Sequence, residues 1–291
     1  MRLFIFGAGY SGRAIAGEMK RAADWIGGTA RSQEKLAALA DAGIEPYPFD
    51  GGALSAQTAA ALDQVTHLVV SIAPDEAGDP VLRAAGEVVK HMPALRWIGY
   101  LSTVGVYGDH GGAWVDEDTR CRPVSKRSVQ RLAAEEEWRR LGAQTALPVA
   151  ILRLAGIYGP GRNAFVNLEN GSARRIVKPD QVFNRIHVDD IAGATAHLAL
   201  AESDGAFNIT DDEPAPPQDV VRHAALLMEI EPPPETAFAD AELSPMARSF
   251  YGENKRVSNR RLAAAGYRLR YRDYRAALEA MWHSGDWRSM S

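Results

Sequence analysis

Cysteine is almost absent from the sequence, since Cys121 is the only one among 291 residues. A single thiol excludes an intrachain disulfide and a thiolate metal cluster, and a reducing compartment is the simplest interpretation. No apolar run approaches the ~18 residues that cross a membrane. Gly7 interrupts the first apolar run, which is therefore not typical of a secretory signal. We expect a cytoplasmic protein with no membrane partner.

Strong charge of either sign is also missing. The formal net charge is −4, which argues against nucleic acid as a partner without excluding a local basic patch. The sequence shows no internal repeat. With 46% hydrophobic residues, the chain is long enough for one large domain or two unequal ones.

The most informative stretch opens the chain. Residues 3–6 form a short apolar run, and Gly7, Gly9 and Gly12 follow at G-x-G-x-x-G spacing before an amphipathic helical stretch over residues 13–19. A strand, a glycine turn and a helix in this order are typical of dinucleotide-binding sites. Gly7 permits a tight turn, Gly9 lets the backbone approach a pyrophosphate, and Gly12 lets the helix lie close to the strand. The alternative is a glycine-rich turn that only packs a helix.

Strands and helices alternate through the first hundred residues. Residues 66–74 form a near-continuous apolar run, which is typical of a buried parallel strand. Residues 25–32 (a strand and its exit), 44–49 and 97–103 are predicted as further strands, and residues 33–42, 54–62 and 80–92 are helical in pattern. The alternation predicts an α/β fold, a Rossmann-type doubly wound parallel sheet. A ligand then belongs at the carboxyl ends of the strands.

One group of residues bears on the choice of dinucleotide. NAD sites usually carry Asp or Glu about 20 residues after the glycines, but Thr29, Arg31 and Ser32 occupy this region. A guanidinium and two hydroxyls bind a 2′-phosphate that a carboxylate would repel. The sequence therefore favours NADP(H), with NAD(H) as the alternative. Arg31 as a solvated residue at a strand end is the other interpretation.

Later motifs resemble those of the extended short-chain dehydrogenases/reductases, the NAD-dependent epimerase/dehydratase family. Residues 101–108 are similar to the family's fifth strand and loop. Residues 157–161 resemble its Tyr-Gly-Pro-Gly exit, and residues 184–192 its His-Val-Asp-Asp stretch. The motifs keep the family's order over nearly the whole chain. The resemblance implies a small-molecule substrate and a homodimer.

The resemblance also implies a division of the chain. We expect a nucleotide-binding domain over residues 1–160, to which residues 184–210 return. Residues 161–183 and 211–291 would form a small C-terminal α/β substrate lobe.

The sequence departs from the family at its catalytic pair, Tyr-x-x-x-Lys on the helix after the fifth strand. Arg127 and Arg131 occupy these two places. Arginine stays protonated near neutral pH, so Arg127 cannot transfer a proton as a phenol does, whereas Arg131 can still donate to a ribose hydroxyl. This departure resembles the atypical branch of the family, whose members keep the cofactor motif. Thr103 occupies the family's Ser/Thr position. Tyr107 is either a relocated acid or a residue that packs the loop.

The expected cofactor-binding residues combine the glycine turn, the region after the second strand, the third and fourth strand exits and the helical arginine: Gly7, Gly9, Tyr10, Ser11, Gly12, Thr29, Arg31, Ser32, Asp50, Ser71, Ile72, Ala73 and Arg131.

Positive charge gathers before the His-Val-Asp-Asp stretch, at Arg174, Lys178 and Arg185. Facing a cleft, these side chains would suit a phosphorylated or carboxylated substrate, such as a nucleotide sugar; a solvated surface is the alternative. The His-Val-Asp-Asp stretch offers too few ligands for a metal site. We expect one of its carboxylates to cap the following helix. No serine lies in a G-x-S-x-G elbow, which argues against a hydrolase.

Two functions are consistent with these observations. The first is an NADP(H)-dependent oxidoreductase or epimerase with a non-standard active site. The second is a non-catalytic NADP(H)-sensing regulatory protein, which the replaced catalytic pair favours.

Overall fold

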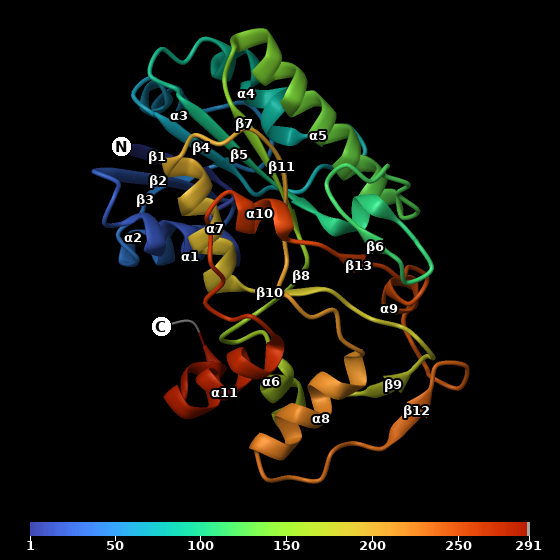
Figure 1. Cartoon of the computed structure of the whole chain (residues 1–291). Helices are drawn as coiled ribbons and strands as arrows, with labels where there is room; N and C mark the ends of the chain where they lie inside the picture. Colours follow the sequence, from blue (N-terminus) through green and yellow to red (C-terminus); the bar gives the residue numbers. More distant parts are fainter. Residues whose placement is uncertain (290–291) are drawn as a thin grey trace. The chain divides into compact units, whose positions relative to one another are not determined.

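The structure is a computed structural model that describes residues 1–289, apart from the side chain of Met246. The chain divides into two compact units. Unit 1 comprises residues 1–106, 126–153 and 191–207, and unit 2 comprises residues 107–125, 154–190 and 208–291. Figure 1 shows the elements of both.

A seven-stranded sheet organises unit 1, in the order β11-β7-β5-β4-β1-β2-β3. Strand β3 pairs with β2, β2 with β1, β1 with β4 and β4 with β5, all in parallel. The strands are β1 (Arg2–Phe6), β2 (Trp25–Ala30), β3 (Glu45–Pro48), β4 (His67–Val70), β5 (Trp97–Thr103), β7 (Val149–Leu154) and β11 (Gly205–Ile209). The predicted doubly wound parallel sheet is confirmed.

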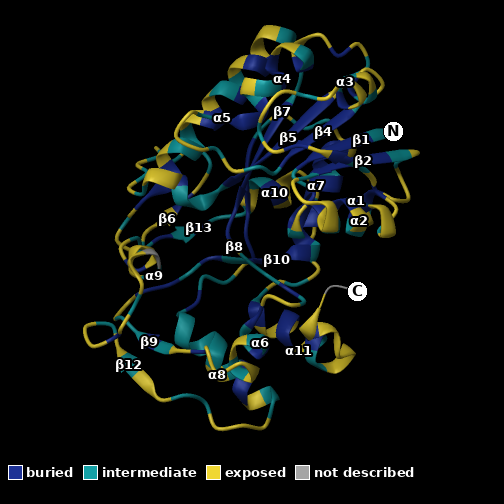
Figure 2. Cartoon of the chain, turned by 180° about the vertical axis from the view of Figure 1, so that it is seen from behind, coloured by how far each residue is buried: buried dark blue, intermediate teal, exposed yellow. Residues whose placement is uncertain are grey.

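Helices cover both faces of this sheet (Figure 1). Successive residues of a strand point to opposite faces: Phe4 and Phe6 belong to the core beneath α4 and α5, whereas Ile5 lies against α1. Strands β4, β5 and β7 are almost entirely buried (Figure 2), as expected of a parallel sheet covered on both sides. The helices are α1 (Tyr10–Met19), α2 (Gln33–Asp41), α3 (Ala56–Leu62), α4 (Pro80–Lys90), α5 (Lys126–Thr145) and α7 (Val188–Leu200).

Three helices of unit 1 begin with a side-chain cap, whereas α1 does not. Ser32, Ser55 and Asp79 cap α2, α3 and α4 by accepting hydrogen bonds from backbone N–H groups of the first turn, which otherwise lack intrahelical partners. Helix α1 has Gly9 at this position, with no side-chain cap and no acidic residue in its first turn.

Unit 2 mixes helices with three two-stranded parallel sheets, β8–β10, β9–β12 and β6–β13. Its elements are β6 (Trp114–Val115), β8 (Gly156–Tyr158), α6 (Ala164–Glu169), β9 (Arg175–Val177), β10 (Arg185–His187), α8 (Pro217–Leu227), β12 (Glu235–Ala237), α9 (Pro245–Phe250), β13 (Arg256–Val257), α10 (Arg260–Ala264) and α11 (Tyr274–Ser284). Short 3-10 turns cover Val104–Tyr107 and Asp286–Arg288.

A small aromatic core holds part of unit 2 together. Phe165 on α6 packs with Tyr274, Leu278 and Met281 of α11, and Trp287 joins them from the following turn. This cluster fixes α6 and α11 on either side of a pocket described below.

Candidate active site

The glycine turn after β1 has the geometry that its spacing predicts. Gly7 adopts a φ of +84°, which favours glycine, and a methyl group there would lie 2.7 Å from Cγ1 of Ile72. A methyl group at Gly12 would lie 3.0 Å from the carbonyl oxygen of Gly7. The tight turn and the close approach of α1 to β1 are therefore confirmed. A methyl group at Gly9 would meet no atom within 4 Å, so the space beside this residue is open.

An open approach to an uncapped helix start is suited to phosphate. The first N–H groups of a helix and its dipole attract an anion, and in α1 no side chain competes for that position. Tyr10 and Ser11 begin the helix, the first partly buried and the second buried. Gly7, Gly9 and Gly12 with this helix start therefore fit the diphosphate of a dinucleotide.

Thr29 has a different role from the one its position predicts. Its side chain is buried, and Oγ1 accepts a hydrogen bond of 2.8 Å from the backbone N–H of Gly7. The backbone carbonyl of Thr29 also accepts from the N–H of Ala8, at 2.9 Å. Thr29 thus holds the glycine turn in place, and its hydroxyl is not presented to a ribose phosphate.

Arg31 and Ser32 lie at the exit of β2, which is parallel to β1, so they are at the same sheet edge as the glycine turn. Both are exposed. Ser32 Oγ accepts from the N–H of Lys35 at 3.4 Å, while Arg31 makes no hydrogen bond or ion pair with any described residue. Asp50 is exposed after β3, where Oδ1 accepts from the N–H of Gly52.

The exit of β4 borders the same edge. Ser71 donates its backbone N–H to Phe6, the last residue of β1, at 2.9 Å. Ile72 is partly buried and packs against the turn at Gly7, and Ala73 follows it on the exposed side.

Arg131 on α5 is fixed against the strand ends. Its Nη1 donates to the carbonyl of Leu101 at 2.8 Å, to the hydroxyl of Tyr100 at 3.2 Å and to the carbonyl of Ile72 at 3.4 Å. The guanidinium also lies 5.5 Å from the centroid of the Tyr100 ring. A permanent cation is therefore held between the ends of β4 and β5, whereas Arg127, one turn earlier, is exposed.

Thr103 ends β5 beside a second hydroxyl that the motifs did not indicate. Thr103 Oγ1 accepts from the N–H of Gly105 at 3.1 Å. A methyl group on Gly105 would lie 2.7 Å from Oγ of Ser128 and 3.3 Å from Oγ1 of Thr103. Glycine at 105 therefore lets the buried Ser128 approach the end of β5.

Tyr107 does not fit the hypothesis of a relocated acid. Its side chain is fully buried in unit 2, and the phenol donates to Oδ1 of Asn208 at 2.8 Å. The packing interpretation is the correct one, because a phenol committed in this way cannot reach a substrate.

Glu135 is a buried residue that sequence reasoning missed. It accepts from Ser102 Oγ at 2.5 Å and from Arg153 Nη2 at 2.9 Å, so it links α5 to β5 and β7. The signal was an arginine within the otherwise apolar stretch 149–154, since a buried charge requires a partner. Ser102 is thereby committed to structure.

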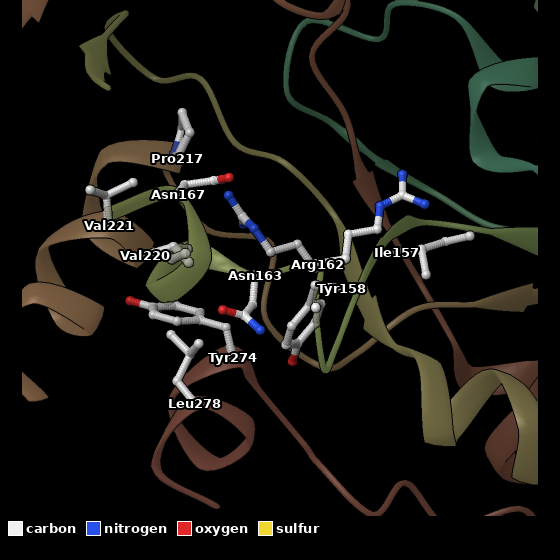
Figure 3. Close-up of a pocket in the computed structure, with 13 residues that line it drawn as sticks. Ile157, Tyr158, Arg162, Asn163, Asn167, Pro217, Val220, Val221, Tyr274 and Leu278 are labelled. Carbon is white, nitrogen blue, oxygen red and sulfur yellow. The ribbon is translucent and has the colours of Figure 1, made fainter. Parts of the chain in front are cut away.

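The three cations expected to bind substrate do not gather at one place. Arg174 is exposed and donates to the carbonyls of Gly171 and Ala173. Lys178 donates to the carbonyl of Tyr251 and lies over the ring of Phe238. Arg185 alone lines a pocket of unit 2, about 390 Å³ in volume, between α6, α8 and α11 (Figure 3).

Two of the resemblance motifs meet beside this pocket. Strand β8 pairs with β10 so that Tyr158 lies opposite His187, and their rings contact edge to face at 5.3 Å. Burial lowers the pKa of His187 to about 4, so the ring is neutral near pH 7. Asp190 does not cap α7, because its carboxylate accepts from Tyr267 Oη and from the N–H groups of Arg270 and Tyr271.

No group of three or more His, Cys, Asp or Glu side chains within residues 1–289 is arranged to hold a metal ion. No helix in the same residues combines the length and apolarity needed to cross a membrane.

Comparisons with known proteins place this geometry in context. A conserved protein of unknown function from Silicibacter pomeroyi is 45% identical, with a TM-score of 0.88 over 98% of this chain and 99% of its own. A 3-diazoavenalumate denitrifying reductase from Streptomyces is 28% identical over 81% of this chain and 84% of its own length. The human epimerase family protein SDR39U1, solved with NADPH, has the same fold at 18% identity, with a TM-score of 0.70 over 97% of this chain and 99% of its own.

The family model described as NAD dependent epimerase/dehydratase matches residues 3–210, from the first strand to the end of the seven-stranded sheet. This match covers more than half of the sequence, and it includes the glycine turn, the end of β5 and the paired strands β8 and β10. The chain belongs to the NAD dependent epimerase/dehydratase family.

Proposed function

We propose that the chain binds a nicotinamide dinucleotide at the carboxyl edge of the unit 1 sheet and acts on a small anionic substrate as an oxidoreductase or epimerase. The observation that carries the proposal is the uncapped start of α1, reached through the turn at Gly7 and open beside Gly9. Membership of the family supports the cofactor class, and the reductase among its relatives supports redox chemistry.

Different residues of unit 1 bind different parts of the cofactor. The first N–H groups of α1 bind the diphosphate. Ser71, Ile72 and Ala73 border the dinucleotide, and the fixed guanidinium of Arg131 donates to a ribose hydroxyl beside the end of β5. When bound, the nicotinamide supplies or accepts a hydride. Thr103 orients the substrate oxygen, while Arg127 holds its proton throughout.

Arg31 and Ser32 favour NADP(H) over NAD(H). An exposed guanidinium with no described partner is available to pair with a 2′-phosphate in bidentate fashion. The test is a titration of the purified chain with NADPH and with NADH, followed by nicotinamide fluorescence. We expect NADPH to bind at least tenfold tighter, about 1.4 kcal/mol. Arg31→Ala should remove this preference without weakening NADH. Equal binding of both dinucleotides by the wild type would contradict the assignment, and binding of neither would contradict the proposed function.

A regulatory role is the second candidate. Arg127 and Arg131 stand in the places of the proton-transferring pair, and Tyr107 is committed to Asn208, so none of these three positions offers a phenol that could transfer a proton. A sensor would bind NADPH yet never oxidise it. Incubation of the chain with NADPH and a panel of small aldehydes, ketones and oxo acids distinguishes the two, because only an enzyme consumes NADPH at a rate that rises with protein concentration.

A further inference from the structure

The pocket of unit 2 contains one firmly positioned cation. Arg185 Nη1 donates to the backbone carbonyls of Phe183 at 2.9 Å and Ala215 at 3.0 Å. These two bonds fix the plane of the guanidinium and use both protons of Nη1. Nε and Nη2 have no partner among the described residues, and together they form one face of the fork, which matches a carboxylate in bidentate fashion.

Arg185 has no ion-pair partner within residues 1–289. The buried Asp211 donates its backbone N–H to the carbonyl of Arg185 at 2.8 Å. Burial raises the pKa of Asp211 well above its ordinary value despite the attraction of Arg185, which favours the neutral acid. A partly buried cation without a counter-charge is costly, and an anion supplied from outside removes that cost.

The rest of the pocket combines a committed amide, an apolar wall and a polar side that includes the buried hydroxyl of Tyr158. Asn163 donates to the carbonyls of Gly159 and Trp287 and accepts from the N–H of Val166, so its amide is fully used. Val220 and Val221 of α8 and Leu278 of α11 form an apolar wall beside the ring of Tyr274 (Figure 3). Arg162 and Asn167 line the exposed side.

The dimensions and the charge indicate a compact ligand. The volume of about 390 Å³ lies at the small end of the ~300–1,000 Å³ typical of small-molecule sites. One free guanidinium face against an apolar wall complements a single carboxylate on an apolar body. A nucleoside diphosphate instead carries several negative charges and a polar sugar, for which this wall offers no donors.

We propose that this pocket binds a compact organic acid, whose carboxylate pairs with Nε and Nη2 of Arg185 and whose apolar body lies against Val220, Val221 and Leu278. The role of this acid as the substrate rests on the proposed function; its binding does not.

Isothermal titration of the full chain without any dinucleotide tests the proposal. The probes are benzoate, cinnamate and hexanoate. Benzamide is the uncharged analogue, and inorganic phosphate and UMP represent the alternative, a phosphorylated ligand. We expect saturable binding of at least one carboxylate, at least tenfold weaker binding of benzamide, and weaker binding of UMP and phosphate. If none of the three carboxylates binds, or UMP binds more tightly than all of them, the proposal is overturned. NADPH binding, measured separately, decides the proposed function.

Two variants locate the site, with a matched control. Arg185→Lys keeps the charge but loses the fork, so carboxylate binding should weaken at least tenfold. Arg174→Lys makes the same change in an exposed arginine that also donates to two backbone carbonyls but does not line the pocket, and it should bind as the wild type does. Val221→Trp fills the pocket from a partly exposed helix position and should abolish binding even if Arg185→Lys fails to fold. Unchanged affinity in Val221→Trp would overturn the assignment.

Discussion

The substitution Gly9→Ala tests whether a diphosphate approaches the start of α1 beside Gly9. A methyl group at Gly9 meets no atom within 4 Å, so no steric clash within the chain opposes it, but the backbone of Gly9 (φ −80°, ψ −148°) lies outside the α and β regions that alanine adopts. The free energy of unfolding should therefore fall by about 1–3 kcal/mol through the backbone conformation alone. The same methyl group would occupy the space through which a diphosphate approaches the helix start. NADPH should bind at least tenfold more weakly, a loss of about 1.4 kcal/mol.

Two other glycines of the same turn and helix are matched controls. Gly17 lies in the last part of α1, is exposed, and has nothing within 4 Å of an added methyl group. Gly17→Ala should stabilise the chain by about 0.5–1 kcal/mol through helix propensity and leave NADPH binding unchanged. A methyl group at Gly12 would lie 3.0 Å from the carbonyl oxygen of Gly7 and 3.2 Å from Cγ2 of Ile5, so Gly12→Ala should destabilise by about 1–3 kcal/mol.

Urea unfolding without the dinucleotide and nicotinamide fluorescence titration provide the two measurements. The reasoning is refuted if folded Gly9→Ala binds NADPH within twofold of the wild type, because the diphosphate then cannot approach Gly9. Equal losses of affinity in Gly9→Ala and Gly17→Ala would instead assign the effect to the helix as a whole.

Three further predictions test other parts of the structure. Thr29→Val removes the buried acceptor of the Gly7 N–H, so urea unfolding should show a loss of about 1–3 kcal/mol. Tyr107→Phe removes the bond to Asn208; the melting temperature should fall while any NADPH oxidation keeps its rate and pH profile, and a changed profile would restore the acid hypothesis. His187 has a folded pKa of about 4 against 6.5 in the unfolded chain, so its contribution to stability is complete above pH 6.5 and is lost as the pH falls toward 4. His187→Asn should therefore lose less stability than the wild type over this range, by up to about 3 kcal/mol, measured by unfolding at each pH.

Elements with strong local signals were predictable from the sequence. The predicted strand 97–103 coincides with β5, and β2 (Trp25–Ala30) lies within the strand and exit predicted over 25–32, because buried parallel strands are rich in apolar residues. Helix α7 begins at Val188, within the His-Val-Asp-Asp stretch and not after it. Its first turn contains Asp190, whose partners lie between residues 267 and 271. A carboxylate committed to a segment almost 80 residues away could not be distinguished from a helix cap in the sequence.

In the candidate site, too, features set by nearby residues were predictable and features set by distant residues were not. The positive φ of Gly7 and the close approach of Gly12 to Gly7 and Ile5 are features of one short segment, and the glycine spacing predicted both. The roles of Tyr107 and Lys178 depend on Asn208 and Tyr251, which are far away in the sequence. Side chains with suitable chemistry were thus recognised, but whether each was free to use it depended on tertiary contacts that no local pattern records.

The two arginines that replace the catalytic pair have unequal consequences. Arg131 remains a cation and is fixed by the carbonyls of Leu101 and Ile72, so the positive charge at the end of β5 is kept. Arg127 supplies no group that titrates near neutral pH. Under the proposed function, charge developing on a substrate oxygen would therefore be stabilised by fixed donors, as in an oxyanion hole, and not by proton transfer from a phenol. An enzyme of this kind should show no pH dependence of turnover that corresponds to a tyrosine, which distinguishes it from relatives that keep the Tyr-x-x-x-Lys pair.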